Sequence, residues 1–164
     1  MAAAAAAPVT VAAVRRPGLR PLAALLLHQS EEWVWPGGFL PWMNREVLGS
    51  DADEFPLNRR LGLVINVGLG WSASLATMVG RRAAAPSAFL YASHLGNVGL
   101  HARWALRHRR YDPGLVTALG TLAPTGILGL RALRGDRRAR AVGAALGAAS
   151  SVALPALLKR RAGL

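Results

Sequence analysis

Two groups of ionisable and polar side chains stand inside otherwise apolar stretches of this sequence. The first group is His28, Glu31 and Glu32, which follows three leucines and precedes Trp33. Positions i, i+3 and i+4 of a helix share one face, so these residues would project together as one imidazole and two carboxylates. A carboxylate at the centre of a bilayer costs about 2.5–3.5 kcal/mol on insertion scales. Two adjacent carboxylates in an apolar segment therefore imply a cation, protons or an aqueous cavity that neutralises their charge.

The second group is His94, Asn97 and His101, which falls on one stripe of a helix at roughly 100° per residue. Tyr91 flanks that stripe. Asn66 stands alone in a third apolar stretch, and an amide in such a place seeks a partner on another helix. Together the three stretches predict a polar cluster inside a bundle of apolar helices.

Imidazole, carboxylate and amide groups are the N and O ligands that suit zinc, iron or manganese. We expect a divalent metal, and the candidate ligands are His28, Glu31, Glu32, His94 and His101. Glu31 and Glu32 are also the candidate catalytic groups, because a glutamate can act as general base to a metal-bound water. Asn66, Tyr91 and Asn97 are expected beside the ligands or the substrate. The alternative is structural: each histidine or amide would then only make a hydrogen bond between helices.

The elements that must position these groups are five apolar segments separated by short arginine-rich joints. They cover residues 21–35, 61–79, 83–104, 113–130 and 139–158. The last four are each long enough to cross a hydrocarbon core of ~30 Å at about 1.5 Å per residue. Tryptophans 33, 35, 42 and 104 lie near segment ends, as is typical of interfacial aromatics. The pattern predicts an all-α integral membrane bundle of four to five helices.

Composition favours lipid over nucleic acid as the surroundings of this chain. Hydrophobic residues make up 52% and charged residues 17%, against about 25% charged in a typical soluble domain. The net charge of +12 is carried by arginines beside apolar runs, where membrane proteins keep them to meet water and headgroups. We therefore expect a multi-pass protein of the cell membrane whose partner is the bilayer, with no nucleic acid. The absence of cysteine excludes disulfides and thiolate metal sites.

The domain organisation is simple. Residues 1–18 form an Ala- and Arg-rich stretch that we expect to be a disordered or interfacial tail, and residues 19–164 form one helix-bundle domain. Residues 36–58 hold half of the acidic side chains and are expected to leave the membrane as a turn and an interfacial piece. The positive-inside rule favours four spans plus a short, half-inserted first helix. Glycines such as Gly143 and Gly147 would let helices approach closely.

Several of these residues form a recognisable set. The string His28-Gln29-Ser30-Glu31-Glu32, the Asn97-x-x-x-His101 element, the stretch 111–114 (Tyr-Asp-Pro-Gly) and Asn66 occur in that combination. The chain thereby resembles the HXXEE domain family, small and mostly bacterial predicted membrane proteins of unestablished activity, over a core of about residues 22–130. The resemblance adds Tyr111 to the groups expected beside the metal or substrate. It implies membrane location and possible metal-binding or hydrolytic motif residues, and it supplies no reaction.

Three functions stay open from the sequence. The first is a membrane-embedded metal-binding enzyme, a hydrolase or an oxidoreductase acting on a lipid or apolar substrate. The second is a small transporter or a proton- or cation-conducting protein in which the same groups form a relay. The third is a structural or partner-binding membrane protein whose polar cluster only fixes helix packing.

Overall fold

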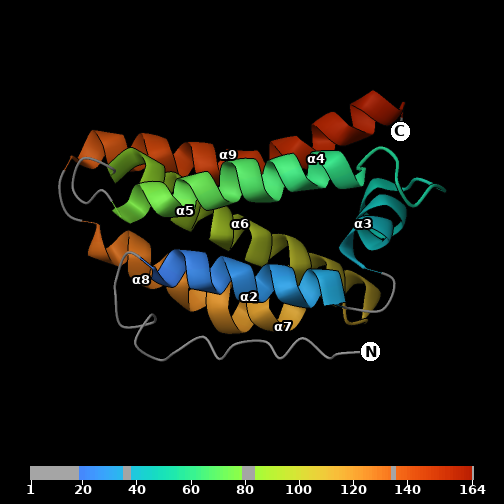
Figure 1. The fold of residues 1–164 in the computed structure, drawn as a ribbon, viewed down its shortest axis with the longest axis horizontal. Coiled ribbons are helices and arrows are strands. Elements are labelled where there is room, and N and C mark those ends of the chain that lie inside the picture. The colour runs from blue at the N-terminus through green and yellow to red at the C-terminus, as the bar shows by residue number, and fades with distance from the viewer. Residues whose placement is uncertain (1–18, 35–37, 79–83, 134–135, 164) are drawn as a thin grey trace, which may run out of the picture.

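The computed structural model describes residues 19–34, 38–78, 84–133 and 136–163. Every regular element within those ranges is a helix (Figure 1). The all-α prediction is confirmed for this part of the chain. The predicted tail, residues 1–18, lies outside the described residues.

Each of the five apolar segments contains helix in the residues that the structure describes. The elements are α2 (Arg20–Val34); the continuous run of α4 (Arg59–Leu63), η2 (Val64–Trp71) and α5 (Ser72–Ala76); α6 (Ala84–His108); the run of α7 (Leu115–Thr117), η4 (Ala118–Leu122) and α8 (Ala123–Ala132); and α9 (Arg137–Ala162). The η elements are π-helical stretches, which often occur near functional sites. The loop after α2 also contains helix, α3 (Phe39–Trp42) followed by η1 (Met43–Leu48).

Helices α4 and α9 each begin with a side-chain cap. The Asn58 side chain accepts a hydrogen bond from the backbone N–H of Leu61 and so caps α4. Asp136 accepts from the N–H groups of Arg138 and Ala139 and caps α9. In both cases a side-chain oxygen satisfies donors that the first turn of a helix leaves unpaired.

Helix α6 is the centre of the bundle and packs most extensively on α9. Gly143 and Gly147 of α9 lie against the backbone of Ala85 and Phe89, so a Cβ at either glycine would collide with a carbonyl group. On the other side of α6, the ring of Tyr91 lies directly over Gly129 of α8. The small residues therefore bring α8 and α9 close to α6, as the sequence predicted.

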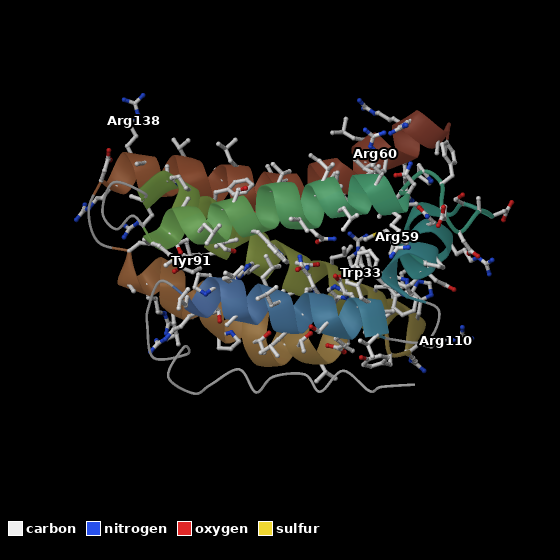
Figure 2. The ribbon with its side chains drawn as sticks, viewed as in Figure 1. Trp33, Arg59, Arg60, Tyr91, Arg110 and Arg138 are labelled. Atoms are coloured by element: carbon white, nitrogen blue, oxygen red, sulfur yellow. The ribbon has the colours of Figure 1, made fainter. Side chains whose placement is uncertain are left out.

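Two runs are long and apolar enough to cross a membrane, Leu115–Ala132 and Arg137–Ala162. Membrane crossing by four or five helices is thus not confirmed for the described residues. Helix α2 has only 15 residues, and the hydropathy of α6 is lowered by polar side chains such as His94, Asn97 and His101. Figure 2 shows labelled arginines at the two ends of the bundle, Arg138 at one end and Arg59, Arg60 and Arg110 at the other.

Candidate metal centre

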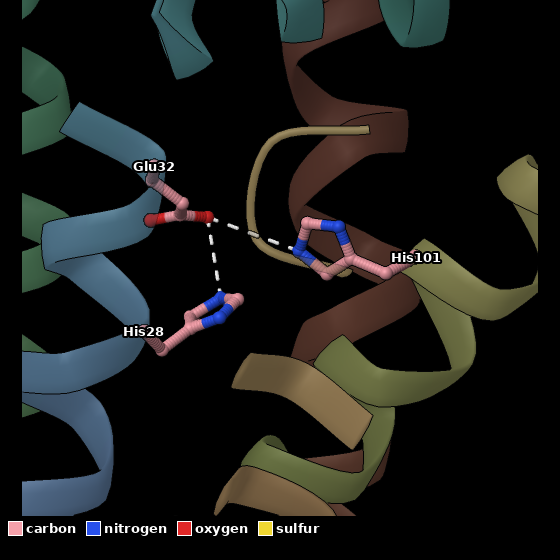
Figure 3. Close-up of side chains that lie close together, drawn as sticks. All are labelled: His28, Glu32 and His101. Atoms are coloured by element: carbon pink, nitrogen blue, oxygen red, sulfur yellow. Dashed lines mark ion pairs between the residues drawn. The ribbon is translucent and has the colours of Figure 1, made fainter. Parts of the chain in front are cut away.

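Three buried side chains from two helices converge near one end of α2. Nε2 of His28 lies 3.3 Å from Oε1 of Glu32, and Nε2 of His101 lies 3.8 Å from the same oxygen (Figure 3). One ligand atom from each residue can be chosen so that all three lie within 4.8 Å of one another. The exposed fractions of His28, Glu32 and His101 are 1%, 3% and 0%. We refer to these three residues as the His/Glu cluster.

Helical geometry places two members of the cluster without tertiary help. His28 and Glu32 are four residues apart on α2, so they lie on the same face about one turn from each other. His101 belongs to α6 and reaches the pair from the side. The ring of His101 meets that of His28 edge-on, with centroids 5.1 Å apart.

Hydrogen bonds at its outer nitrogen orient the His28 ring. Nδ1 lies 3.1 Å from Oγ1 of Thr117, whose hydroxyl in turn donates to the carboxylate of Glu31. The threonine oxygen is then free to accept, so Nδ1 of His28 carries the proton and Nε2 presents a lone pair. That lone pair faces Glu32 and the amide Nδ2 of Asn97, which is 2.9 Å away.

His101 is oriented in the same way by a different partner. Its Nδ1 lies 2.7 Å from Oδ1 of Asp112, and both side chains are fully buried. The ring of Trp42 stacks on His101 at 5.6 Å with an interplanar angle of 9°. Nε2 of His101 has no hydrogen-bond partner among the described residues. A carboxylate on the outer nitrogen of a histidine is the arrangement that fixes the tautomer of metal-binding imidazoles.

Glu31 is not one of the three residues of the His/Glu cluster. Its carboxylate accepts hydrogen bonds from the hydroxyls of Tyr111 and Thr117 and from the backbone N–H groups of Thr117 (2.7 Å) and Val116 (3.3 Å). Burial, and then the hydrogen bond to Glu31, raise the pKa of Tyr111 above its usual value. Glu31 therefore anchors the first turn of α7 to α2, and it acts on the cluster only through Thr117.

Gly114 closes the cluster on the side of the loop between α6 and α7. Its φ of +103° is a conformation that favours glycine. A Cβ at this position would lie 2.7 Å from Cε1 of His28, 3.0 Å from Cε1 of His101 and 3.1 Å from Cγ of Glu32. The loop backbone can approach the two rings this closely only because residue 114 has no side chain.

Of the other predicted site residues, Asn97 lies next to the cluster, and His94, Asn66 and Tyr91 do not belong to it. Asn97 contacts His28 directly. His94 is 3% exposed, lines an apolar cavity, and is not among the three convergent residues. Asn66 lines the same cavity, and its backbone oxygen accepts from Gln29 at 3.5 Å. Tyr91 packs on Gly129 at the contact of α6 with α8.

Sequence reasoning gave no role to four residues that shape the site. These are Trp42, Asp112, Gly114 and Thr117. Asp112 and Gly114 lie in the stretch that supported the family resemblance, so their presence was a signal even though no role followed from it. Thr117 carries no signal in the sequence, because a threonine in an apolar segment is ordinary. Trp42 was expected only to lie near a membrane interface, and its ring stacks on a ligand candidate.

The donor set fits a divalent metal. Two imidazoles and one carboxylate with an open position form the His₂Glu set of hydrolytic zinc sites and the facial triad of non-haem iron. Ligand atoms around a tetrahedral zinc at 2.0–2.1 Å are roughly 3.3–3.4 Å apart. The separations of 3.3 and 3.8 Å from Oε1 of Glu32 to the two histidine nitrogens are close to that value, and all three ligand atoms lie within 4.8 Å of one another.

Comparison with known proteins gives one family. The family model described as a protein of unknown function with an HXXEE motif matches residues 21–128. Neither a curated protein nor a solved structure matches the chain. The matched range includes every member of the cluster and the residues that orient it.

Proposed function

Because this chain belongs to the family of proteins of unknown function with an HXXEE motif, we propose a function from its own site: a membrane-embedded metalloprotein whose divalent ion is held by His28, Glu32 and His101. The centre would support hydrolysis or oxidation of a lipid or other apolar substrate. Zinc, iron and manganese all suit this ligand set.

One observation carries the proposal. Three electron-pair donors, two imidazole nitrogens and a carboxylate oxygen, face one another in a buried site. The outer nitrogen of each ring is occupied by Thr117 or Asp112, so neither ring is free to turn its N–H toward the centre without losing that contact. Buried polar groups need partners, and among these three atoms Nε2 of His101 has no hydrogen-bond partner in the described part of the chain, whereas Nε2 of His28 contacts the amide of Asn97. A cation would replace that amide at His28 and would bind all three atoms together.

The ligand set also provides a place for chemistry. Three protein ligands leave at least one position of a tetrahedral ion open for water or substrate. When bound, such an ion supplies Lewis acidity and lowers the pKa of its water to ≈ 7. Asn97, whose amide reaches Nε2 of His28, lies on the cavity side and would contact a molecule at the open position.

The hydrogen-bonded groups around the His/Glu cluster give less support to a function in proton or ion conduction. The connected chain runs from Tyr111 through Glu31, Thr117 and His28, and by way of Glu32 to His101 and Asp112. Tyr111 and Asp112 are adjacent residues, so the chain returns to the loop where it began. A proton or ion route across a membrane would have to continue toward the opposite end of the bundle.

The surface of the bundle supports membrane embedding. Only 17% of the most apolar window of Leu115–Ala132, and of that of Arg137–Ala162, is buried, whereas the core helix of a soluble protein would be mostly buried. Large apolar side chains point outward on these runs: Val116, Leu119, Ile127, Leu128, Val142, Leu146, Val152 and Leu157. Apolar patches of this extent on a soluble monomer are unusual, and lipid is their natural partner.

Elemental analysis of the full chain purified in mild detergent tests the metal centre. We expect about one divalent ion per chain, and its loss in Glu32→Gln and His101→Ala. Glu46→Gln, at an exposed carboxylate of η1, is the carboxylate control. His108→Ala, at an exposed histidine of α6, is the histidine control. Both variants should retain the ion. Helix content and elution volume verify that each variant folds. A folded wild-type protein that takes up no ion after dialysis against zinc, iron or manganese would refute the proposal.

A further inference from the structure

A cavity of about 400 Å³ lies beside the His/Glu cluster, between α6, the η2 segment, α9 and α2. Its walls are mostly apolar and include Leu25, Ile65, Leu69, Phe89, Leu90 and Leu154. The size is within the ~300–1,000 Å³ that ligand pockets usually have. On α6 the lining runs from Phe89 to Leu100, which is about 16 Å of helix at 1.5 Å per residue. A volume of this size spread over that length makes a narrow, elongated space.

One polar side chain in this cavity has nothing to bind. His94 is 3% exposed, it lines the cavity, and neither of its ring nitrogens has a hydrogen-bond partner among the described residues. Leaving a buried polar group unpaired is unfavourable, so its partner is expected to be a molecule in the cavity. A neutral imidazole offers one donor and one acceptor, and it matches a group that can both accept and donate.

The cavity is continuous with the candidate metal centre. Glu32 and Asn97 both line it, and Nδ2 of Asn97 is 2.9 Å from Nε2 of His28. His94 and Asn97 are three residues apart on α6 and therefore lie on one face. A molecule whose polar end contacts both His94 and Asn97 would place that end near His28, which Asn97 contacts, while the rest of the molecule lies along apolar walls.

The cavity reaches the apolar surface of the bundle. Leu69 and Leu157 line it, yet 61% and 60% of these side chains are exposed. They belong to the η2 segment and to α9, and neighbouring outward side chains such as Val67 and Val152 are also exposed and apolar. A molecule can thus enter sideways from a hydrocarbon phase without crossing water.

We propose that this cavity binds one single-chain lipid with an uncharged hydrogen-bonding end group, such as a long-chain alcohol, with the end group on His94 and Asn97 beside Glu32. The inference rests on the proposed function, because it names the substrate class of that same centre. One acyl chain can lie along the apolar walls, whereas a second chain would lie on the open side of the cavity, with fewer contacts.

Binding of radiolabelled hexadecanol to the full chain in nanodiscs tests this. We expect saturable binding that hexadecanol itself displaces, with a two-chain phosphatidylcholine at least about tenfold weaker as a competitor. His94→Leu keeps an apolar side chain in place but removes the hydrogen bonds. It should weaken hexadecanol about tenfold or more and leave competition by hexadecane unchanged.

A matched pair of variants tests the location. Ala73 lines the cavity, whereas Ala76, one turn further along α5, does not. Ala73→Phe should abolish hexadecanol binding and Ala76→Phe should not. Equal binding by both variants, or undiminished hexadecanol binding by a folded His94→Leu, would overturn the inference.

Metal content measured on the same preparations separates the two proposals. His94→Leu and Ala73→Phe should keep the metal, because neither residue belongs to the cluster. A metal-containing wild type that binds no hexadecanol would overturn this inference alone. A metal-free wild type that binds hexadecanol with the stated selectivity would support the lipid cavity and remove only the metal chemistry.

Discussion

Asp112 and His101 form a fully buried pair in which a carboxylate oxygen lies 2.7 Å from Nδ1 of the imidazole. The pair joins the loop after α6 to the helix itself and turns Nε2 of His101 toward Glu32. It ties the stretch 111–114 to the HXXEE string on α2, although the two lie about eighty residues apart in the chain.

Removal of this orienting carboxylate should weaken metal binding without removing a ligand. We expect Asp112→Ala to lower metal affinity about 10- to 100-fold, the usual effect of losing such a partner. Asp112→Asn should lose less, because its amide oxygen can still accept from Nδ1. Competition with a chromophoric chelator measures both affinities. Equal affinity in wild type and Asp112→Ala would show that the pair does not tune the ligand.

A side chain at residue 114 should disrupt the cluster. Gly114→Ala places a methyl group within 3.1 Å of all three members and adds backbone strain of about 1–3 kcal/mol at positive φ. Gly49→Ala is the matched control, since its φ is +76° but nothing lies within 4 Å of a Cβ there. We expect both variants to be less stable to heat, and only Gly114→Ala to lose metal. Retention of metal by Gly114→Ala would contradict the proposed closure.

The hydroxyl group of Thr117 should contribute to stability and to metal binding, beyond what the volume of its side chain contributes. Thr117→Val removes the hydroxyl contacts to His28 and Glu31 at nearly constant volume. Loss of buried hydrogen bonds should destabilise the protein by about 1–3 kcal/mol and weaken the metal site. Thr121→Val, one turn along the same run, loses hydroxyl contacts to Ala24 and Thr117 carbonyls and should spare the metal. Denaturant unfolding in detergent, with metal titration, distinguishes the two variants.

Tyr111 should make stability sensitive to alkaline pH. Its pKa is raised above the ordinary value of 10.0 by burial and by its hydrogen bond to Glu31. A raised pKa in the folded state means that the contribution is fully present below 10.0 and is lost as pH rises through the higher folded value. We therefore expect wild type to be more stable than Tyr111→Phe at neutral pH, with the difference shrinking above pH 10.0. A difference that does not change with pH would count against ionisation of this phenol.

Membrane embedding can be mapped by cysteine labelling, because the chain has no native cysteine. Val152→Cys places a thiol on the exposed face of α9, where 74% of the valine is accessible. Arg138→Cys places one in the first turn of the same helix, at an end of the bundle. In intact membranes a water-soluble maleimide should label only residue 138. Labelling of residue 152 before detergent is added would place α9 outside the hydrocarbon core.

The sequence by itself determined the helices and the pairing of His28 with Glu32. Apolar runs bounded by arginines predict helices, and the structure shows helix in the described part of each run. The spacing of four residues fixes that pair, because helical geometry is local. The positions of Gly129, Gly143 and Gly147 likewise predict close helix contacts, and these glycines do lie against α6.

Only the tertiary structure decided which candidates meet. Glu31 and Glu32 both lie close to His28 on a helix. The rotation of α2 about its axis brings Glu32 into the cluster and directs Glu31 to Tyr111 and Thr117. His94 and His101 are seven residues apart, hence on one stripe but about 10 Å apart along the axis. The axial position of α2 along α6 places Glu32 next to His101, so His101 belongs to the cluster and His94 lines the cavity. Helical periodicity sets which way a side chain points, whereas rotation and height of one helix against another depend on packing that no local spacing encodes.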